Sequence, residues 1–252
     1  MRFKHFLTEE KENSNDKKKI VPVVLTPAQE KNRLDKKING VKTLSKNIRS
    51  LKVCACRDIG SENEKKRLTA AVISIMVKTA ERVGNQTSEN NGHVGITGLQ
   101  AKHISFADGK ATLSYIGKSG VSHEKVISDS KLVDILKQYT KGKKDSENIF
   151  VTKDGIKIQN RHVNNYLEEF GISAKDIRGY SANEWMIKEL SNKSIPSNET
   201  ERKKIFLEVL KKVADKVGHG AATLRKHYLL PQLEDGFMKS GTIIDLKSFH
   251  SY

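Results

Sequence analysis

A histidine and a tyrosine stand nine residues apart in a cationic stretch near the C-terminal end of the sequence. The stretch covers residues 217–231, reads VGHGAATLRKHYLLP, and places Arg225 and Lys226 between His219 and Tyr228. A tyrosine phenol has an ordinary pKa of ~10, so it attacks phosphorus only where fixed positive charge stabilises the phenolate and the phosphorane. A simpler interpretation also fits this window alone: a Gly-His turn before a helix, and a tyrosine that covers the core.

Isolated basic residues upstream favour the chemical interpretation, because each has a recognisable local context. Arg82 falls at the end of a helix predicted over residues 68–83, where apolar residues recur at helical spacing. A cation there also suits the helix dipole, so a simple capping arginine is an equal alternative. Arg178 lies in the first turns of a helix predicted over residues 174–190. An arginine buried at such a place is typically bound to a carboxylate or a phosphate.

A change of period to two predicts a small antiparallel sheet in the middle of the chain. Residues 103–106, 111–116 and 121–127 read as three strands, joined by an Asp-Gly turn and by a Gly-Lys-Ser-Gly turn. Lys118 therefore lies at a hairpin tip. Such lysines are usually solvated, but a hairpin tip can also insert a flexible ammonium into a groove.

The rest of the chain reads mainly as helix, apart from a glycine- and asparagine-rich loop after Arg82. Thr26 before Pro27 signals a helix start, and the amphipathic pattern continues towards Leu51. We therefore expect an α+β fold that is mainly helical with a small three-stranded antiparallel sheet. Further helices are predicted over residues 131–139, 160–170 and 201–217, and a short strand over residues 149–151.

Charge and length limit the class of protein. The 252 residues carry a formal net charge of +16 and are 36% hydrophobic, which suits one or two domains and a polyanionic partner. The sequence has neither an apolar run long enough for a membrane span nor an apolar signal core, which predicts a soluble intracellular protein. Cys54 and Cys56 are too close for an ordinary disulfide and read as thiols of a reducing compartment.

Four segments in this order resemble the type IB DNA topoisomerases, in particular their poxvirus-like and bacterial branch, within the superfamily that they share with the tyrosine recombinases. The segments are AERVGNQTSENNGHVGITGLQAKHI, YIGKSGVSHEKVI, KDIRGYSANEWMIKEL and VGHGAATLRKHYLLP, and the resemblance covers roughly residues 68–231. Each segment alone would be a weak signal, but their common order is a strong one. The resemblance implies a catalytic domain over residues 21–252. Residues 1–20 are charged and almost free of aliphatic side chains after Leu7, which predicts a disordered basic tail before this domain.

The resemblance also implies a role for each cation. Tyr228 would be the nucleophile that forms a 3′-phosphotyrosyl link to one strand of duplex DNA, and Lys118 would protonate the departing 5′ oxygen. Arg82, Arg178 and His219 would hold the non-bridging phosphate oxygens. Further DNA contacts are expected from Lys175, Arg225, Lys226 and His103.

No cofactor and no metal would be needed by such an enzyme. The phosphotyrosine preserves the energy of the phosphodiester bond, so resealing requires no ATP, and arginines stand where other enzymes use metal ions. Rotation of the free strand would relax supercoils of either sign. We expect a monomer in the bacterial cytoplasm or nucleoid, or in the virion or host cell of a large DNA virus.

Two alternatives remain open at this stage. A tyrosine recombinase or integrase would share most of these residues, but recombinases generally carry a histidine three residues before the second arginine, where this chain has Lys175. A catalytically silent DNA-binding module would explain the charge, but not the ordered set of Arg, Lys, Arg, His and Tyr.

The sequence also departs from the family pattern. Ser88 stands near a position where many relatives have tyrosine, and the loop after Arg82 is about one residue shorter than is usual. Relatives carry an N-terminal β-rich domain that closes over the DNA, and we expect this domain to be absent here. A partner protein would then complete the clamp.

Overall fold

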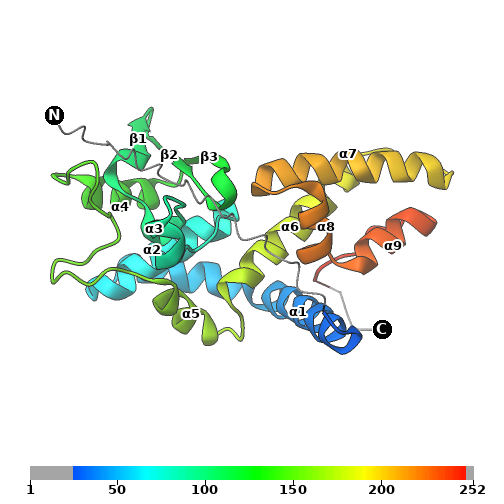
Figure 1. The fold of residues 1–252 in the computed structure, drawn as a ribbon, viewed down its shortest axis with the longest axis horizontal. Helices are drawn as coiled ribbons and strands as arrows, with labels where there is room; N and C mark the ends of the chain where they lie inside the picture. Colours follow the sequence, from blue (N-terminus) through cyan, green and yellow to red (C-terminus); the bar gives the residue numbers. More distant parts are fainter. Residues whose placement is uncertain (1–24, 248–252) are drawn as a thin grey trace, which may run out of the picture.

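The computed structural model describes residues 25–247, and it is mainly helical with one three-stranded antiparallel sheet in this range (Figure 1). The predicted α+β class is therefore confirmed. The proposed tail over residues 1–20 lies outside the described residues, and the division into a tail and one catalytic domain stays a prediction.

The first helix, α1, spans Pro27–Asp58 and begins where the sequence predicts. The Thr26 side chain accepts a hydrogen bond from the backbone of Gln29, whose side chain in turn accepts one from the backbone of Thr26. This capping box, with Pro27 at the first helical position, satisfies donors that the first turn leaves open. The helix ends seven residues later than expected at Leu51, because buried positions such as Ala55 continue the apolar stripe.

The second helix, α2, spans Glu64–Thr79, so the predicted range of 68–83 is wrong at both ends. The Asn63 side chain caps its start, and Ala80 ends it in the left-handed conformation with φ at 55°. Arg82 consequently lies beyond the helix, and the interpretation of a helix-capping arginine is wrong. The loop that follows contains a short helix, α3 (Gln86–Asn90), which the sequence reading missed.

The sheet has the predicted order β1-β2-β3, with antiparallel pairing throughout. Asp108 and Gly109 both adopt positive φ in the first turn, as the Asp-Gly pair predicts. The predicted strand at residues 149–151 is wrong, since within it only Val151 forms an isolated bridge, to Lys157. The strands are β1 (Ile104–Ala107), β2 (Lys110–Ile116) and β3 (Ser122–Ile127), and the helical turns around them are η1 (Ile96–Gly98), η2 (Ala101–His103) and η3 (Lys118–Gly120).

The remaining elements are helices that agree with the predicted ranges to within about two residues at each end, apart from α8 and α9, for which no range was predicted. They are α4 (Ser130–Thr140), α5 (Asn160–Glu168), α6 (Ala174–Ser191), α7 (Glu199–Val217), α8 (Ala221–His227) and α9 (Pro231–Ser240).

The sheet and α2 to α4 form one end of the molecule, and α7 to α9 form the other (Figure 1). The helices α1 and α6 pack against each other and join the two ends, since α1 also contacts α2 and α6 also contacts α7. One continuous cluster of buried apolar side chains runs through both ends. Segments that are far apart in the sequence therefore meet where the two ends join.

Candidate active site

Arg178 is the most deeply placed cation of the site. Its side chain comes from the second turn of α6 and is 3% exposed. Its Nη2 donates to the backbone oxygen of Val217 and to Nε2 of His219, both at 2.9 Å. Its Nε and Nη1 are buried and have no hydrogen-bond partner within residues 25–247. Burial lowers the pKa of this guanidinium. The carboxylate partner that we considered for this arginine is not present in the described part of the chain.

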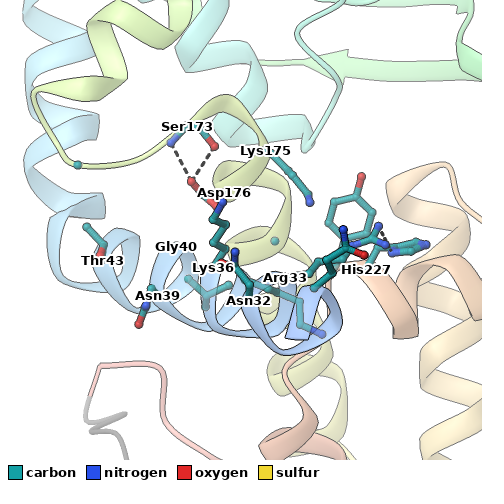
Figure 2. A pocket seen from close by; sticks show the side chains of 16 residues that line it. Asn32, Arg33, Lys36, Asn39, Gly40, Thr43, Ser173, Lys175, Asp176 and His227 are labelled. Carbon is teal, nitrogen blue, oxygen red and sulfur yellow. Dashed lines mark hydrogen bonds between the residues drawn. The ribbon is translucent and has the colours of Figure 1, made fainter. Parts of the chain in front are cut away.

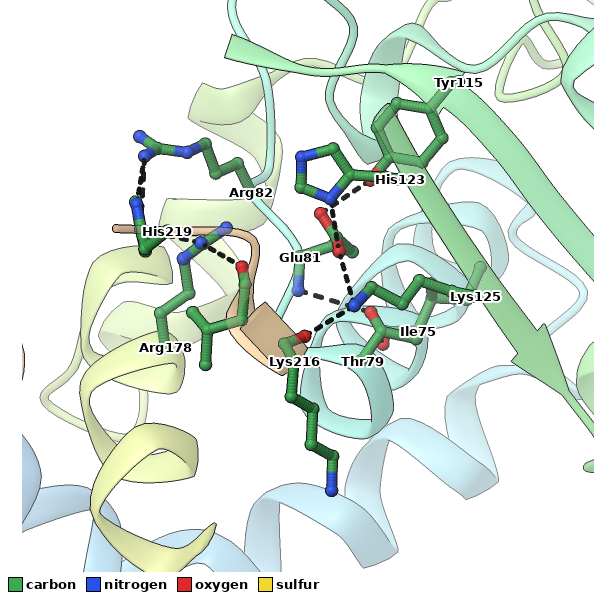
Figure 3. Close-up of polar contacts among 11 residues, drawn as sticks. Ile75, Thr79, Glu81, Arg82, Tyr115, His123, Lys125, Arg178, Lys216 and His219 are labelled. Carbon is green, nitrogen blue, oxygen red and sulfur yellow. Dashed lines mark hydrogen bonds and ion pairs between the residues drawn. The ribbon is translucent and has the colours of Figure 1, made fainter. Parts of the chain in front are cut away.

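His219 lies in the turn between α7 and α8, where Gly218 ends α7 with φ at 72°. Besides Arg178, the Nη2 of Arg82 reaches its Nε2 at 3.2 Å (Figure 3). Burial, followed by the positive charges of Arg178 and Arg82, lowers the pKa of His219 to about 3. The ring is therefore neutral at pH 7 and can accept one hydrogen bond while it donates another.

Arg82 reaches His219 from the extended segment that follows α2. The left-handed Ala80 redirects the chain at the end of the helix. The backbone oxygen of Arg82 then accepts a hydrogen bond from Ile96 N at 2.9 Å, and Thr97 N bonds Val83 O in the same way. The loop after α3 thus fixes the backbone from which the half-buried Arg82 side chain extends.

Tyr228 stands at the C-terminal end of α8 and is 7% exposed. Its ring centroid lies 5.0 Å from that of His219 and 5.8 Å from Cζ of Arg178. The buried Asn183 of α6 holds the backbone that follows the Tyr228 Cα, donating to Tyr228 O at 2.9 Å and accepting from Leu230 N at 2.9 Å. Sequence reasoning missed Asn183, and the available signal was a polar residue among the apolar positions of α6.

Lys118 lies at the start of η3, at the tip of the β2–β3 hairpin, as predicted. Its side chain is exposed and has no ion pair within the described residues. It lines a pocket of about 450 Å³ together with Arg82, Arg178, Lys175 and Tyr228. The structure therefore brings the five predicted catalytic residues to one place, with Lys118 at its open edge.

A second, larger pocket of about 590 Å³ continues from this place along α1 (Figure 2). Lys175 and Tyr228 line both pockets. The second pocket is strongly cationic, and its basic side chains are Arg33, Lys36 and Lys37 of α1, Lys175 of α6 and His227 of α8. The cations of α1 were not among the residues predicted to contact DNA.

The other residues predicted to contact DNA have mixed surroundings. Lys226 is exposed on α8 and lines a small pocket with Lys37. Arg225 forms a two-pronged ion pair with Glu234 of α9, in which its Nε lies 2.8 Å from Oε2. His103 accepts a hydrogen bond from the backbone of Gln100 at 3.0 Å and lines neither of the two large pockets. Roles of these three residues in DNA binding stay predictions.

Other binding features are few in the part of the chain that the structure describes. Within it, no group of three or more His, Cys, Asp or Glu side chains is arranged to hold a metal ion. Over the same residues, no helix is both long and apolar enough to cross a membrane. Cys54 and Cys56 are free thiols, as expected.

The fold and the site together define a mainly helical domain that gathers two arginines, a histidine and a lysine around one tyrosine. Residues 28–235 match the family model described as the catalytic core of eukaryotic DNA topoisomerase I. The chain therefore belongs to this family, which confirms the resemblance stated from the four segments.

Two curated relatives match this chain over part of their length. DNA topoisomerase I of monkeypox virus and DNA topoisomerase 1B of vaccinia virus (strain Copenhagen) are each 27% identical over 162 residues, which is 64% of this chain and 50% of theirs. The chain thus spans about half the length of these curated relatives.

Two solved structures of a recombinase are also similar. XerH site-specific recombinase bound to difH substrate, in a pre-cleavage complex, has 16% identity and a TM-score of 0.41 over 81% of this chain and 52% of that one. The post-cleavage complex with palindromic difH substrate has 15% identity and a TM-score of 0.44 over 84% and 51%.

Proposed function

We propose that this chain is a type IB DNA topoisomerase, which nicks one strand of duplex DNA through a 3′-phosphotyrosyl link at Tyr228, lets the strand rotate and reseals it. The observation that carries this proposal is the pair of unpartnered nitrogens on buried Arg178, beside the Tyr228 ring. Each buried donor that is left without a partner costs ~1–3 kcal/mol. A phosphate is the ligand whose oxygens match such a planar donor group.

The chemistry follows from the position of each group. The hydroxyl oxygen of Tyr228 releases its proton to solvent and forms a bond to phosphorus while the bond from phosphorus to the 5′ oxygen breaks, so the number of phosphate esters is unchanged. Arg82 and Arg178 stabilise the charge on the non-bridging oxygens, and His219 donates a further hydrogen bond to one of them. Lys118 supplies a proton to the 5′ oxygen, and the reverse steps reseal the strand. These cleavage and resealing steps require neither ATP nor a metal ion.

Duplex DNA would lie across both pockets. Because Lys175 and Tyr228 line the two pockets in common, a phosphate placed on Arg178 has neighbouring phosphates in reach of the α1 cations. Contacts of this kind give affinity without sequence preference. We further propose that the enzyme acts as a monomer. The clamp around the DNA would be completed by a partner protein or by a segment of the same protein outside the part that matches the relatives.

The test uses supercoiled plasmid in EDTA without ATP. We expect a ladder of relaxed topoisomers, and the Tyr228→Phe variant should give none while it still binds the plasmid, because one hydroxyl carries the covalent step. Joined recombinant products would instead support the recombinase alternative. Retention of the plasmid without any strand cleavage would leave only a DNA-binding module, and would refute the proposal.

A further inference from the structure

A buried carboxylate lies directly behind the proposed active site. Glu81 is 1% exposed and precedes Arg82 in the chain, and the two side chains point away from each other (Figure 3). Its Oε2 accepts a hydrogen bond from the Tyr115 hydroxyl at 2.7 Å, and its Oε1 accepts one from Nδ1 of His123 at 2.9 Å (Figure 3). Nζ of Lys125 lies 3.4 Å from the same Oε1. All three partners come from the β2–β3 hairpin.

His123 connects this carboxylate to two further segments. A Cβ added to Gly117 would meet Cδ2 and Nε2 of the His123 ring at 2.6 Å, and one added to Gly218 would meet its Cε1 at 2.4 Å. The ring therefore packs against two positions, 117 and 218, where any residue other than glycine would force the ring or the backbone to move. Lys125 adds a third connection, since its Nζ donates to the backbone oxygen of Lys216 at 2.6 Å.

Each of these contacts lies next to a residue of the proposed chemistry. Glu81 precedes Arg82, Gly117 precedes Lys118, and Gly218 precedes His219. The three segments come from the end of α2, the hairpin tip and the end of α7, and they have no covalent connection near the site.

We propose that Glu81, through His123 and Lys125, is a positioning residue that fixes Arg82, Lys118 and His219 relative to one another, and so acts on the chemical step rather than on DNA binding. This inference rests on the proposed function. Reactive groups need placement within about 0.5 Å, and an error of ~1 Å can cost ~10²-fold in rate.

The chemistry of the cluster fits such a role. Burial raises the pKa of Glu81, but the hydrogen bonds and charge of His123, the Tyr115 hydroxyl and the charge of Lys125 outweigh it and lower the pKa below its ordinary value. The carboxylate is therefore ionised and acts only as an acceptor. A glutamine at this position would leave at least one of the three donors without its acceptor.

The first experiment compares Glu81→Gln with Glu208→Gln, which removes the same charge from an exposed ion pair that Glu208 of α7 forms with Lys193. We expect Glu81→Gln to slow covalent adduct formation on plasmid ~10–100-fold under single-turnover conditions. Its Kd for DNA should stay within about threefold or tighten, because a negative charge is removed from a cationic site. The Glu208→Gln variant should match the wild type in both. Wild-type cleavage by Glu81→Gln, or a defect confined to Kd, would overturn the proposal.

The second experiment tests the contact between His123 and the hairpin. Gly117→Ala forces a Cβ against the His123 ring, whereas Gly220→Ala, on the other side of His219, meets nothing within 4 Å. We expect only Gly117→Ala to slow cleavage, and its effect should shrink at least ~3-fold in a His123→Ala background, since the clash is then removed. Additive effects of the two substitutions would contradict the proposed contact.

A measurement without DNA separates this inference from the proposed function. In ¹H–¹⁵N spectra of the free protein, Glu81→Gln should shift the His219 ring resonances, while Glu208→Gln should leave them unchanged. If the wild type fails to cleave DNA, the proposed function is refuted, and the spectra still decide whether Glu81 positions His219. Unshifted His219 resonances would refute the positioning role.

Discussion

Replacing Arg178 with methionine should abolish cleavage without destabilising the free protein. Its Nε and Nη1 carry three N–H groups that are buried without partners, and each such donor costs ~1–3 kcal/mol. The substitution also removes the two hydrogen bonds that Nη2 makes to Val217 O and His219, worth ~1.5–3 kcal/mol each for a charged donor. The gain from removing the three unpartnered donors is therefore similar to the loss of the two hydrogen bonds. We expect the free energy of unfolding to stay constant or to rise by up to ~2 kcal/mol.

Arg202 provides the matched control, because it is also buried, at 7% exposed, but every nitrogen of its guanidinium donates a hydrogen bond. Its guanidinium donates to the backbone oxygens of Pro196, Ser197, Met238 and Lys239. Arg202→Met should therefore destabilise the protein by ~3–5 kcal/mol, as the removal of one partner from a satisfied buried group does.

Urea unfolding at pH 7 measures both variants, and adduct formation on plasmid measures the chemistry. Loss of fixed donors at a phosphate should slow cleavage by Arg178→Met at least ~10³-fold. Equal destabilisation by the two substitutions would show that Arg178 is a structural residue with satisfied bonds, and the argument from its free donors would fail. Cleavage that persists in a stable Arg178→Met protein would remove it from the active site.

Three further outcomes follow from the same geometry. A substrate with a 5′-bridging sulfur at a mapped cleavage site should rescue Lys118→Ala, whose general-acid contribution is ~10²–10⁴-fold, but not Arg82→Ala; equal rescue of both would argue against proton donation by Lys118. The pKa of His219 is about 3 in the folded protein and 6.5 ordinarily, so the unfolded chain binds more protons between these values, and the free energy of unfolding decreases as the pH is lowered from 6.5 towards 3. His219→Gln should flatten this dependence in urea unfolding, and an unchanged slope would contradict the burial of a neutral ring. Lys36→Ala with Lys37→Ala should reduce the slope of log K against log salt by ~0.9 for each phosphate that the variant no longer neutralises, and an unchanged slope would place the DNA elsewhere.

The elements were predictable where the sequence carries a local signal. The Thr26-Pro27 start of α1 and the Asp108-Gly109 turn are specified by side-chain caps and by residues that tolerate positive φ. The end of α2 was not predictable, because an alanine adopts the left-handed position that glycine usually fills. Because α2 ends four residues earlier than predicted, Arg82 lies in the segment after the helix and not at the helix end.

That the candidate residues would lie together was predictable, but their contacts were not. The order of four motifs identified Arg82, Lys118, Arg178, His219 and Tyr228, and the structure brings them together from five separate elements. Nothing local in the sequence shows that Glu81 turns inward, since a glutamate beside an arginine reads as an exposed charge. Long-range packing against the hairpin decides its direction, and periodicity does not encode such packing.

The electrostatics of the free site argue that His219 changes its role when phosphate binds. Two arginines lie against Nε2 of one neutral ring, at 2.9 and 3.2 Å, and Nη2 of Arg82 also lies 3.4 Å from Nδ1. The shorter contacts favour Nε2 as the acceptor and Nδ1 as the nitrogen that carries the ring proton. A phosphate between the arginines offers them stronger acceptors than an imidazole nitrogen. Nε2 is then released, and its protonation allows the ring to donate to a phosphate oxygen, which also raises the pKa of His219 from about 3. We therefore expect the ¹⁵N resonance of Nε2 to move from the unprotonated towards the protonated range when Tyr228→Phe protein binds duplex DNA. A ring that keeps Nε2 unprotonated in the complex would leave the two arginines, and not His219, as the donors to the phosphate.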